Sequence, residues 1–417
     1  MQTTPKSLRL TIAILGRVNT GKSSLLNYIA GQDVAITAPL PGTTTDVVEK
    51  PMEFPPLGPV LFLDTAGLDD TSELGGRRVA RTAKASDRSD VTILVLEAGV
   101  LGPHEEQVLA QAKAQNRPLI AVVNKCDLAP PQSGWLEKVR VHTPHVLCVA
   151  TTDAAGREKF LAGLRQALLA VCPDEFVQAP PLIGDLVKSG GIAVLVVPID
   201  LQAPKGRLIL PQVQTIRDAL DNDAAVLVVK ERELSHILQH LNAPPDVVVC
   251  DSQVVQKVLA DTPHSIPCTT FSILFARIKG DLQRLAEGAA AVDRLRDGDT
   301  VLIAEACSHH ALEDDIGRVK IPRWLRQYTG ATLTVETTAG RDFPENLQKY
   351  RLIVQCGGCM INRREVLGRI QQAQAAGVPI TNYGLCIAHT QGVLQRVLSP
   401  FPAALDAFQR AAKTSNR

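Results

Sequence analysis

The chain has 417 residues, of which 45% are hydrophobic and 21% charged, as expected for a folded protein long enough for two or three domains. Its formal net charge of +1 creates no field that would attract nucleic acid or an anionic membrane, so neither is expected as a partner. The N-terminus lacks a leader pattern and no apolar run reaches the roughly 18–20 residues of a membrane span, so we expect a cytoplasmic protein whose nine cysteines are reduced thiols or metal ligands.

The first predicted elements surround a phosphate-binding loop. Residues 8–15 form an apolar, β-branched run that predicts a buried strand, and residues 22–30 predict a helix. Between them, residues 16–23 (GRVNTGKS) match G-x-x-x-x-G-K-[S/T] at every constrained position. In such a loop, Lys22 spans the β- and γ-phosphate oxygens and Ser23 offers a hydroxyl to Mg²⁺. The predicted nucleotide-binding residues here are Asn19, Thr20, Gly21, Lys22, Ser23 and Ser24.

A loop that can sense the γ-phosphate follows. After a glycine–threonine segment and a short predicted strand at residues 46–49, residues 60–67 (VLFLDTAG) predict a buried strand that ends in D-x-x-G. Asp64 can hold Mg²⁺ through water, and the N–H of Gly67 can meet the γ-phosphate. Leu68 stands where Ras-like enzymes have a water-orienting Gln, so we expect slow hydrolysis.

Guanine recognition is predicted by residues 124–127 (NKCD), which follow an apolar strand at residues 119–123. In N-K-x-D the carboxylate, here Asp127, accepts two hydrogen bonds from the guanine N1–H and 2-amino group, which adenine cannot supply. Residues 1–175 are therefore expected to form a GTP-binding domain, with Asn124, Lys125 and Asp127 at the base. Its other predicted elements are strands 91–97 and 145–149 and helices 103–115 and 157–172.

Residues 7–172 resemble a small GTPase domain of the translation-factor-related class. Asn19 and the loop at residues 42–44 (GTT) resemble those of GTPases that dimerise and use potassium. The resemblance implies that Thr44 contacts Mg²⁺ and the γ-phosphate, alongside Lys22, Asp64 and Gly67. It also implies that Asn19 helps to bind K⁺, which would make hydrolysis faster in K⁺ than in Na⁺. Thr151 lies where related GTPases usually have a serine–alanine turn under the base, and this resemblance alone implies a role for it.

Residues 183–264 predict a second, smaller α/β unit. Strands alternate with helices, which indicates a parallel sheet, and about 80 residues are few for an independent core. We therefore expect a module for homodimerisation. His236 and His240 lack a third ligand nearby and are expected on a solvated helix face. The predicted strands are 192–198, 225–229 and 247–250, and the predicted helices are 211–222 and 231–241.

Residues 265–417 predict a third α/β domain with two cysteine groups. After a loop and helical connection at residues 266–295, strand 300–305 leads to Cys307, and strand 352–355 leads to Cys356 and Cys359. Both groups follow strands of a parallel sheet, so they can meet at one edge. Three thiolates with a nearby His fit a Cys₃His zinc site, a 4Fe–4S cluster with one open iron, or a thiol–disulfide centre. The spacing leaves these alternatives open. The remaining predicted elements are strands 332–336 and 379–381 and helices that span 362–376 and start at 383.

The order of the three domains resembles that of the FeFe-hydrogenase maturation GTPases over essentially the whole chain. The resemblance is carried by residues 251–253 (DSQ), 304–310 (AEACSHH) and 381–384 (TNYG). It implies an iron–sulfur cluster-binding domain in which Cys307, Cys356 and Cys359 hold a 4Fe–4S cluster. Gln355 replaces the family's usual second His, which leaves Glu305, His309 or water as the fourth ligand.

The same resemblance implies a scaffold or carrier. Such a protein accepts a diiron precursor from two radical-SAM partner enzymes, holds it near the 4Fe–4S cluster and passes it to apo FeFe-hydrogenase, with GTP as a timer. The competing expectation is a zinc-containing regulatory GTPase that acts in tRNA modification or ribosome assembly. Anaerobic reconstitution would separate the two, because an iron–sulfur protein is brown and a zinc protein is colourless.

Overall fold

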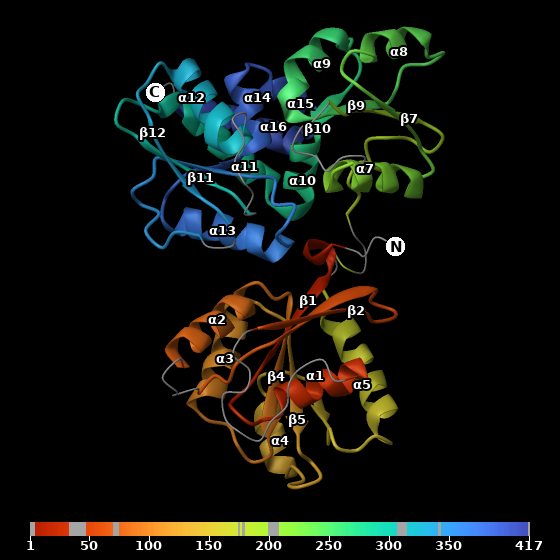
Figure 1. Cartoon of the computed structure of the whole chain (residues 1–417), viewed down its shortest axis with the longest axis vertical. Coiled ribbons are helices and arrows are strands. Elements are labelled where there is room, and N and C mark those ends of the chain that lie inside the picture. The colour runs from red at the N-terminus through yellow and green to blue at the C-terminus, as the bar shows by residue number, and fades with distance from the viewer. Residues whose placement is uncertain are drawn as a thin grey trace. The chain divides into compact units, whose positions relative to one another are not determined.

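The computed structural model describes residues 5–32, 47–69, 75–173, 176, 180–198, 208–306, 315–340 and 343–415, with the backbone alone for residues 75–80, 414 and 415. The chain folds into two compact units, Met1–Ala179 and Pro180–Arg417 (Figure 1). None of the described helices is long and apolar enough to cross a bilayer.

The first unit is built on a 6-stranded sheet with the order β2-β3-β1-β4-β5-β6. All its neighbours pair in parallel except β2, which runs antiparallel to β3 at the edge. Alternate side chains of the buried central strand β1 serve two cores: Ile14 packs with α1 and α5, whereas Leu15 packs with α3 on the other face. The strands are β1 (Leu10–Leu15), β2 (Val48–Glu53), β3 (Pro59–Asp64), β4 (Val91–Glu97), β5 (Leu119–Asn124) and β6 (Val146–Cys148). The helices are α1 (Lys22–Ala30), α2 (Gly75–Asp87), α3 (Pro103–Ala114), α4 (Ser133–Arg140) and α5 (Arg157–Val171).

The second unit contains two parallel 4-stranded sheets, with the orders β10-β9-β7-β8 and β12-β11-β13-β14. The strands are β7 (Ile192–Val196), β8 (Ala225–Val229), β9 (Val247–Cys250), β10 (Cys268–Thr270), β11 (Thr300–Ala304), β12 (Thr334–Thr338), β13 (Leu352–Gln355) and β14 (Ile380–Asn382). The helices are α7 (Leu210–Asp221), α8 (Leu234–His240), α9 (Val255–Asp261), α10 (Phe271–Lys279), α11 (Leu282–Ala289), α12 (Ile321–Thr329), α13 (Arg363–Ala375), α14 (Tyr383–Thr390), α15 (Leu394–Leu398) and α16 (Pro402–Ser415).

The two sheets of the second unit share one hydrophobic core. A single cluster of buried residues includes Val194 of β7 and Ile353 of β13, together with Leu274 of α10. Helix α10 contacts α7 beside the first sheet as well as α13 and α14 beside the second (Figure 1). The two predicted modules of this region are therefore two sheets within one compact body.

The α/β class and the P-loop architecture are confirmed, but several elements were not predicted: the helices α2, α4, α9, α12, α15 and α16 and the strand β10. Helices α2 and α4 fall between motifs, where the sequence analysis expected no element. Residues 268–270 were expected in a loop and helical connection, but they form β10, whose Thr270 is in register with Cys250 of β9. The sheet β10-β9-β7-β8 therefore extends past residue 264, where the predicted module ends.

Candidate nucleotide site and cysteine loop

The phosphate loop joins β1 to α1, as predicted. In the register of β1 with β3, Ile14 lies opposite Asp64, so both strands end at the same edge of the sheet. Ser23, in the first turn of α1, donates a hydrogen bond from Oγ to Asp64 Oδ2 at 2.6 Å. The predicted Mg²⁺ residues of the loop and of D-x-x-G are thus in direct contact.

Asp64 has the environment of a cation ligand. Its side chain is completely buried, and Oδ1 has no hydrogen-bond partner among the residues that the structure describes. Burial raises the pKa of Asp64, while the hydrogen bond from Ser23 and the charge of Lys22 lower it. A buried carboxylate oxygen without a partner, beside a hydroxyl, fits the oxygen ligands that Mg²⁺ prefers.

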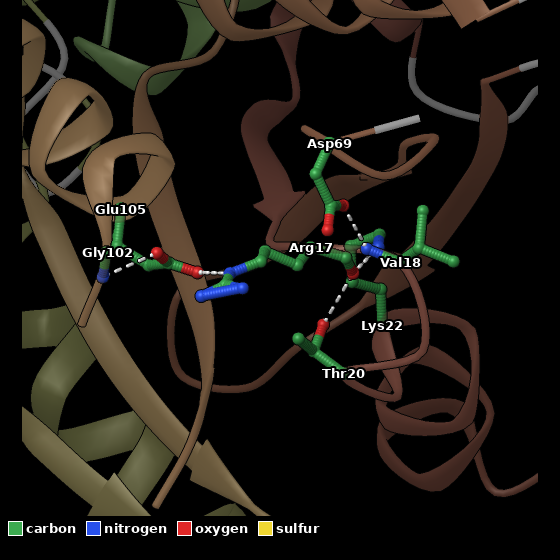
Figure 2. A network of polar contacts seen from close by, with 7 residues as sticks. All are labelled: Arg17, Val18, Thr20, Lys22, Asp69, Gly102 and Glu105. Carbon is green, nitrogen blue, oxygen red and sulfur yellow. Dashed lines mark hydrogen bonds and ion pairs between the residues drawn. The ribbon is translucent and has the colours of Figure 1, made fainter. Parts of the chain in front are cut away.

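The Lys22 ammonium lies within the phosphate loop. Its side chain is buried, and Nζ donates to the carbonyl oxygen of Arg17 at 2.6 Å (Figure 2). Burial lowers the pKa of Lys22 to about 8, opposed by the charges of Asp64 and Asp69. A phosphate oxygen is a charged acceptor and would bind this ammonium more strongly than a carbonyl does.

Gly21 and Asn19 of the phosphate loop have a positive φ, which only some residue types adopt readily. Gly21 has a φ of +90°, and a Cβ at this position would overlap the side-chain amide of Asn124. Asn19 has a φ of +63°, a conformation that asparagine tolerates better than most residues. The amide of Asn124 donates from Nδ2 to the carbonyl of Thr20 at 3.0 Å, so the phosphate and base motifs support each other.

Two carboxylates that the sequence analysis did not single out hold the loop. Arg17 Nε donates to Oε1 of the buried Glu105 at 2.6 Å, and Oε2 of Glu105 accepts the N–H of Gly102 at the start of α3 at 2.9 Å. On the other side, the N–H of Val18 donates to Asp69 Oδ1 at 2.7 Å. Figure 2 shows both anchors around the loop. Glu105 forms one half of a capping box, because Gly102 has no side chain to accept a bond in return; a Glu three residues after a helix start signals this cap but does not mark Arg17 as its partner.

Gly67 of D-x-x-G lies against the phosphate loop. A Cβ at Gly67 would stand 2.7 Å from the backbone nitrogen of Val18 and would overlap its side chain. The next residue, Leu68, donates its N–H to the carbonyl of Gly16 at 3.1 Å. The close approach makes Gly67 a sensitive position for substitution.

Gly67→Ala is expected to slow GTP hydrolysis on the order of 10²-fold, the usual effect of losing one donor to developing charge, because the added methyl group forces the D-x-x-G loop away from the γ-phosphate. GDP affinity should change little, since the Gly67 N–H is expected to meet only the γ-phosphate. Single-turnover hydrolysis and GDP titration measure the two effects. Gly134→Ala is the matched control, because nothing lies within 4 Å of a Cβ there. Equal hydrolysis rates in both variants would contradict this assignment.

The base motif occupies the ends of β5 and β6. Asp127 accepts a hydrogen bond at Oδ2 from the hydroxyl of Thr152 at 2.9 Å, so Thr152 orients this carboxylate. Lys125 has a φ of +59° and forms an ion pair with Glu97. Ser24 and Thr151, both predicted nucleotide residues, line one pocket of about 470 Å³.

In the second unit, Cys356 lies at the carboxyl end of β13, directly after Gln355. Its Sγ accepts the N–H of Ala306 at 3.1 Å, and its own N–H donates to the carbonyl of Ala304 at 2.9 Å. Burial raises the pKa of the Cys356 thiol, opposed by the N–H groups of Gly358 and Ala306, which stabilise a thiolate. This sulfur therefore contacts the chain that follows β11.

Two buried cations lie beside this cysteine loop, residues 356–361. Lys279, at the end of α10, donates from Nζ to the carbonyls of Gly358 and Ile361, each at 2.9 Å. Arg369 of α13 donates to the carbonyl of Gly340 at 2.9 Å, and its guanidinium lies 5.2 Å from the centre of the Phe343 ring. Burial lowers the pKa of both groups, to about 8 for Lys279, and a thiolate at Cys356 would oppose this in each case. Neither cation was singled out from the sequence.

Glu305, one of the candidates for a fourth ligand, forms an ion pair with Arg318. Glu305 is buried, and its Oε2 accepts two hydrogen bonds from the Arg318 guanidinium, from Nε at 3.2 Å and from Nη2 at 2.9 Å. Cluster ligation by Glu305 would require this ion pair to open. His309 and Cys307 lie outside the described residues, as does Thr44. Within the described ranges, no group of three or more His, Cys, Asp or Glu residues is placed to hold a metal ion.

Three family models match the chain in succession. They are the 50S ribosome-binding GTPase at residues 11–125, the hydrogen maturase F dimerization domain at residues 182–280 and the hydrogen maturase F tetramerization domain at residues 283–400. The predicted dimerisation module at residues 183–264 lies within the second of these matches. Both sheets of the second unit thus coincide with domains described as oligomerization domains.

Curated relatives are similar over a part of the chain. The tRNA modification GTPase MnmE of Acaryochloris marina is 36% identical over 177 residues, which are 42% of this chain and 36% of the relative. The same enzyme of Synechococcus sp. (strain JA-3-3Ab) is 48% identical over 160 residues, 38% of this chain and 32% of the relative. The chain thus spans about a third of the length of these relatives. An Era protein of Aquifex aeolicus bound to GDP and aluminium fluoride is 19% identical, with a TM-score of 0.35 over 56% of this chain and 98% of that one.

Proposed function

Because the chain has the successive domains of the hydrogen maturase F family and belongs to it, we propose that it is a GTP-binding scaffold for hydrogenase maturation. In this role it holds a 4Fe–4S cluster on Cys307, Cys356 and Cys359. It takes up a diiron precursor made by two radical-SAM enzymes and delivers it to apo FeFe-hydrogenase. It acts as an oligomer, with a homodimer as the basic form.

The observation that carries the cluster proposal is the hydrogen bond from Ala306 to the Cys356 sulfur. Ala306 directly precedes Cys307 in the sequence. The backbone that leads to Cys307 is therefore in contact with the sulfur of Cys356. N–H donors to sulfur and nearby positive charge are the surroundings in which proteins hold iron–sulfur clusters. A cluster with three protein thiolates would supply an open iron to which a precursor can attach. The described residues around Cys356 and Cys359 fit that group.

The cysteine loop would orient the cluster and leave it accessible to the diiron precursor. The N–H groups of Ala306 and Gly358 hold the Cys356 sulfur in one orientation. Ile361 at the end of the loop and Val366 of α13 are both buried, and they pack near Gly358. The partly exposed Cys359 leaves the outer side accessible to an incoming group.

The GTPase part supplies a switch. Asp64 and Ser23 would hold Mg²⁺, Lys22 would bind the phosphates, and the loops at Gly67 and Thr44 would respond to loss of the γ-phosphate. Asn124 and Asp127 would select guanine. With Leu68 in place of a water-orienting side chain, turnover is slow, as suits a timer.

Anaerobic reconstitution with iron and sulfide tests the proposal. We expect a brown protein with about four iron and four sulfide per chain, the composition of one 4Fe–4S cluster, and activation of apo-hydrogenase when both radical-SAM enzymes are present. The second candidate is a zinc-containing GTPase that acts on tRNA or in ribosome assembly, and it is favoured by the MnmE likeness. A colourless protein that retains stoichiometric zinc would support that candidate and overturn the cluster.

GTP hydrolysis is expected to be faster in K⁺ than in Na⁺ at equal ionic strength. The reason is that the amide oxygen of Asn19 would help to hold the larger cation beside the phosphates. Asn19→Gly tests this, because glycine adopts the φ of +63° found here without strain but has no amide. The variant should lose the preference for K⁺ while it still binds GDP. Equal rates in the two salts for the unmodified protein would rule out the potassium site.

A further inference from the structure

Lys279 is a buried lysine whose position is unusual for its residue type. It is the last residue of α10, where a lysine would normally reach into water, yet it is only 4% exposed. Its Nζ donates to three main-chain carbonyls of the cysteine loop: Gly358 at 2.9 Å, Cys359 at 3.4 Å and Ile361 at 2.9 Å. One ammonium thus joins α10 to the cysteine loop.

This contact determines which way the loop presents its backbone. The C=O and N–H of a trans peptide point in opposite directions. Drawing the carbonyls of Gly358 and Cys359 towards Lys279 therefore turns the N–H groups of Cys359 and Met360 away from it. Gly358 completes the turn with a φ of +64°. Successive N–H groups turned to one side form the kind of concavity that binds anions, including iron–sulfur clusters.

The charge of Lys279 points to the same kind of ligand. Its acceptors are neutral carbonyls, and burying an ammonium without an anion costs several kcal/mol. Cys359, a predicted metal ligand, is itself one of the residues whose carbonyl Lys279 contacts, whereas the carboxylate of Glu365 accepts the N–H of Asn362 at 3.1 Å. Arg369 adds a second buried cation whose described hydrogen bond also goes to a carbonyl. The loop therefore carries positive charge that two thiolates and an anionic metal centre would balance.

We propose that Lys279 is the positioning residue of the cysteine loop and the counter-charge of the anionic metal–thiolate centre that binds there. The inference rests on the proposed cluster and assigns it a dedicated cation from the α10 helix. Lys279 does not ligate the metal. It holds the carbonyls on one side of the loop, keeps the N–H groups directed to the other, and favours the more negative, reduced state of the centre.

Three substitutions separate these roles in the full-length protein. Lys279→Arg keeps the charge, Lys279→Gln keeps donors without charge, and Lys279→Met removes both. Lys257→Met is the control, because this lysine is half exposed and pairs with Asp261 on the surface of the same unit. Each protein is reconstituted anaerobically with iron and sulfide, and circular dichroism and GTP binding show whether it folds.

The expected results differ for each variant. Lys279→Met should retain the least iron and lose it fastest to a chelator. Lys279→Gln should retain a cluster that is reduced at a more negative potential than that of the unmodified protein, whereas Lys279→Arg should restore the original potential. A purely structural role would leave the potentials of the Gln and Arg variants alike.

Two outcomes would overturn the inference while leaving the cluster proposal intact. If the unmodified protein binds a cluster and Lys279→Gln has an unchanged potential, Lys279 is not its counter-charge. If Lys279→Met retains iron as the Lys257→Met control does, Lys279 does not position the loop. Failure of the unmodified protein to bind a cluster would instead overturn the proposed function. Amide hydrogen exchange of residues 356–361 in the metal-free proteins still tests positioning in that case, since exchange should be faster in Lys279→Met and unchanged in Lys257→Met.

Discussion

Replacing Cys356 or Cys359 by serine is expected to reduce bound iron to background and to abolish activation of apo-hydrogenase. A serine hydroxyl stays protonated at neutral pH, so it cannot replace a thiolate on iron. Cys307→Ser should behave in the same way. The measurements are iron and sulfide per chain, the visible absorption spectrum after anaerobic reconstitution, and hydrogenase activity after incubation with the two partner enzymes.

GTP turnover provides the internal control for these variants. The cysteine loop belongs to the unit Pro180–Arg417, whereas the nucleotide motifs belong to Met1–Ala179, so turnover should persist in all three. Cys148→Ser is the matched cysteine control, because this thiol is exposed and lies on β6 of the first unit. A serine variant at 356 or 359 that still activates hydrogenase normally would refute the scaffold proposal.

Asp127→Asn is expected to weaken GTP binding by about 10²–10⁴-fold, because it removes two charge-assisted hydrogen bonds to guanine, each with a contribution of about 1.5–3 kcal/mol. Xanthosine triphosphate should bind better to the variant than to the unmodified protein. Xanthine carries a carbonyl where guanine has its 2-amino group, and an asparagine amide can donate to that carbonyl.

Titration with both nucleotides measures this exchange of specificity. Glu137→Gln serves as the control, because it neutralises an exposed carboxylate of α4 that forms an ion pair with Arg140, three residues away. If Asp127→Asn keeps the original affinity for GTP, then Asp127 does not read the base and the assignment of residues 124–127 fails.

The nucleotide site could be predicted because its signals are local. Each motif couples a strand, a turn with a required backbone conformation and a helix start within a few residues, as at Gly21 and Lys22. The contact of Ser23 with Asp64 across 41 residues also followed, since the phosphate loop leaves the end of β1 and Asp64 ends β3, the neighbouring parallel strand. Except for β10, the strands of the second unit were also predicted from the sequence.

The supports of both sites could not be predicted, because they depend on tertiary packing. Arg17 and Glu105 are 88 positions apart, and nothing near Arg17 in the sequence marks its partner. Lys279 and Gly358 are 79 positions apart, and a lysine that ends a helix is ordinarily a surface residue. Strand β10 was missed because three residues, two of them threonines, carry no clear periodicity.

The common core of the two sheets in the second unit has a thermodynamic consequence. Because Val194, Leu274 and Ile353 belong to one buried cluster, the two sheets cannot melt one after the other without exposing a shared apolar surface. The two halves should therefore unfold cooperatively, as one thermodynamic domain. Self-association through the sheet β10-β9-β7-β8 would then also stabilise the other sheet, whose strand β13 leads to Cys356 and Cys359.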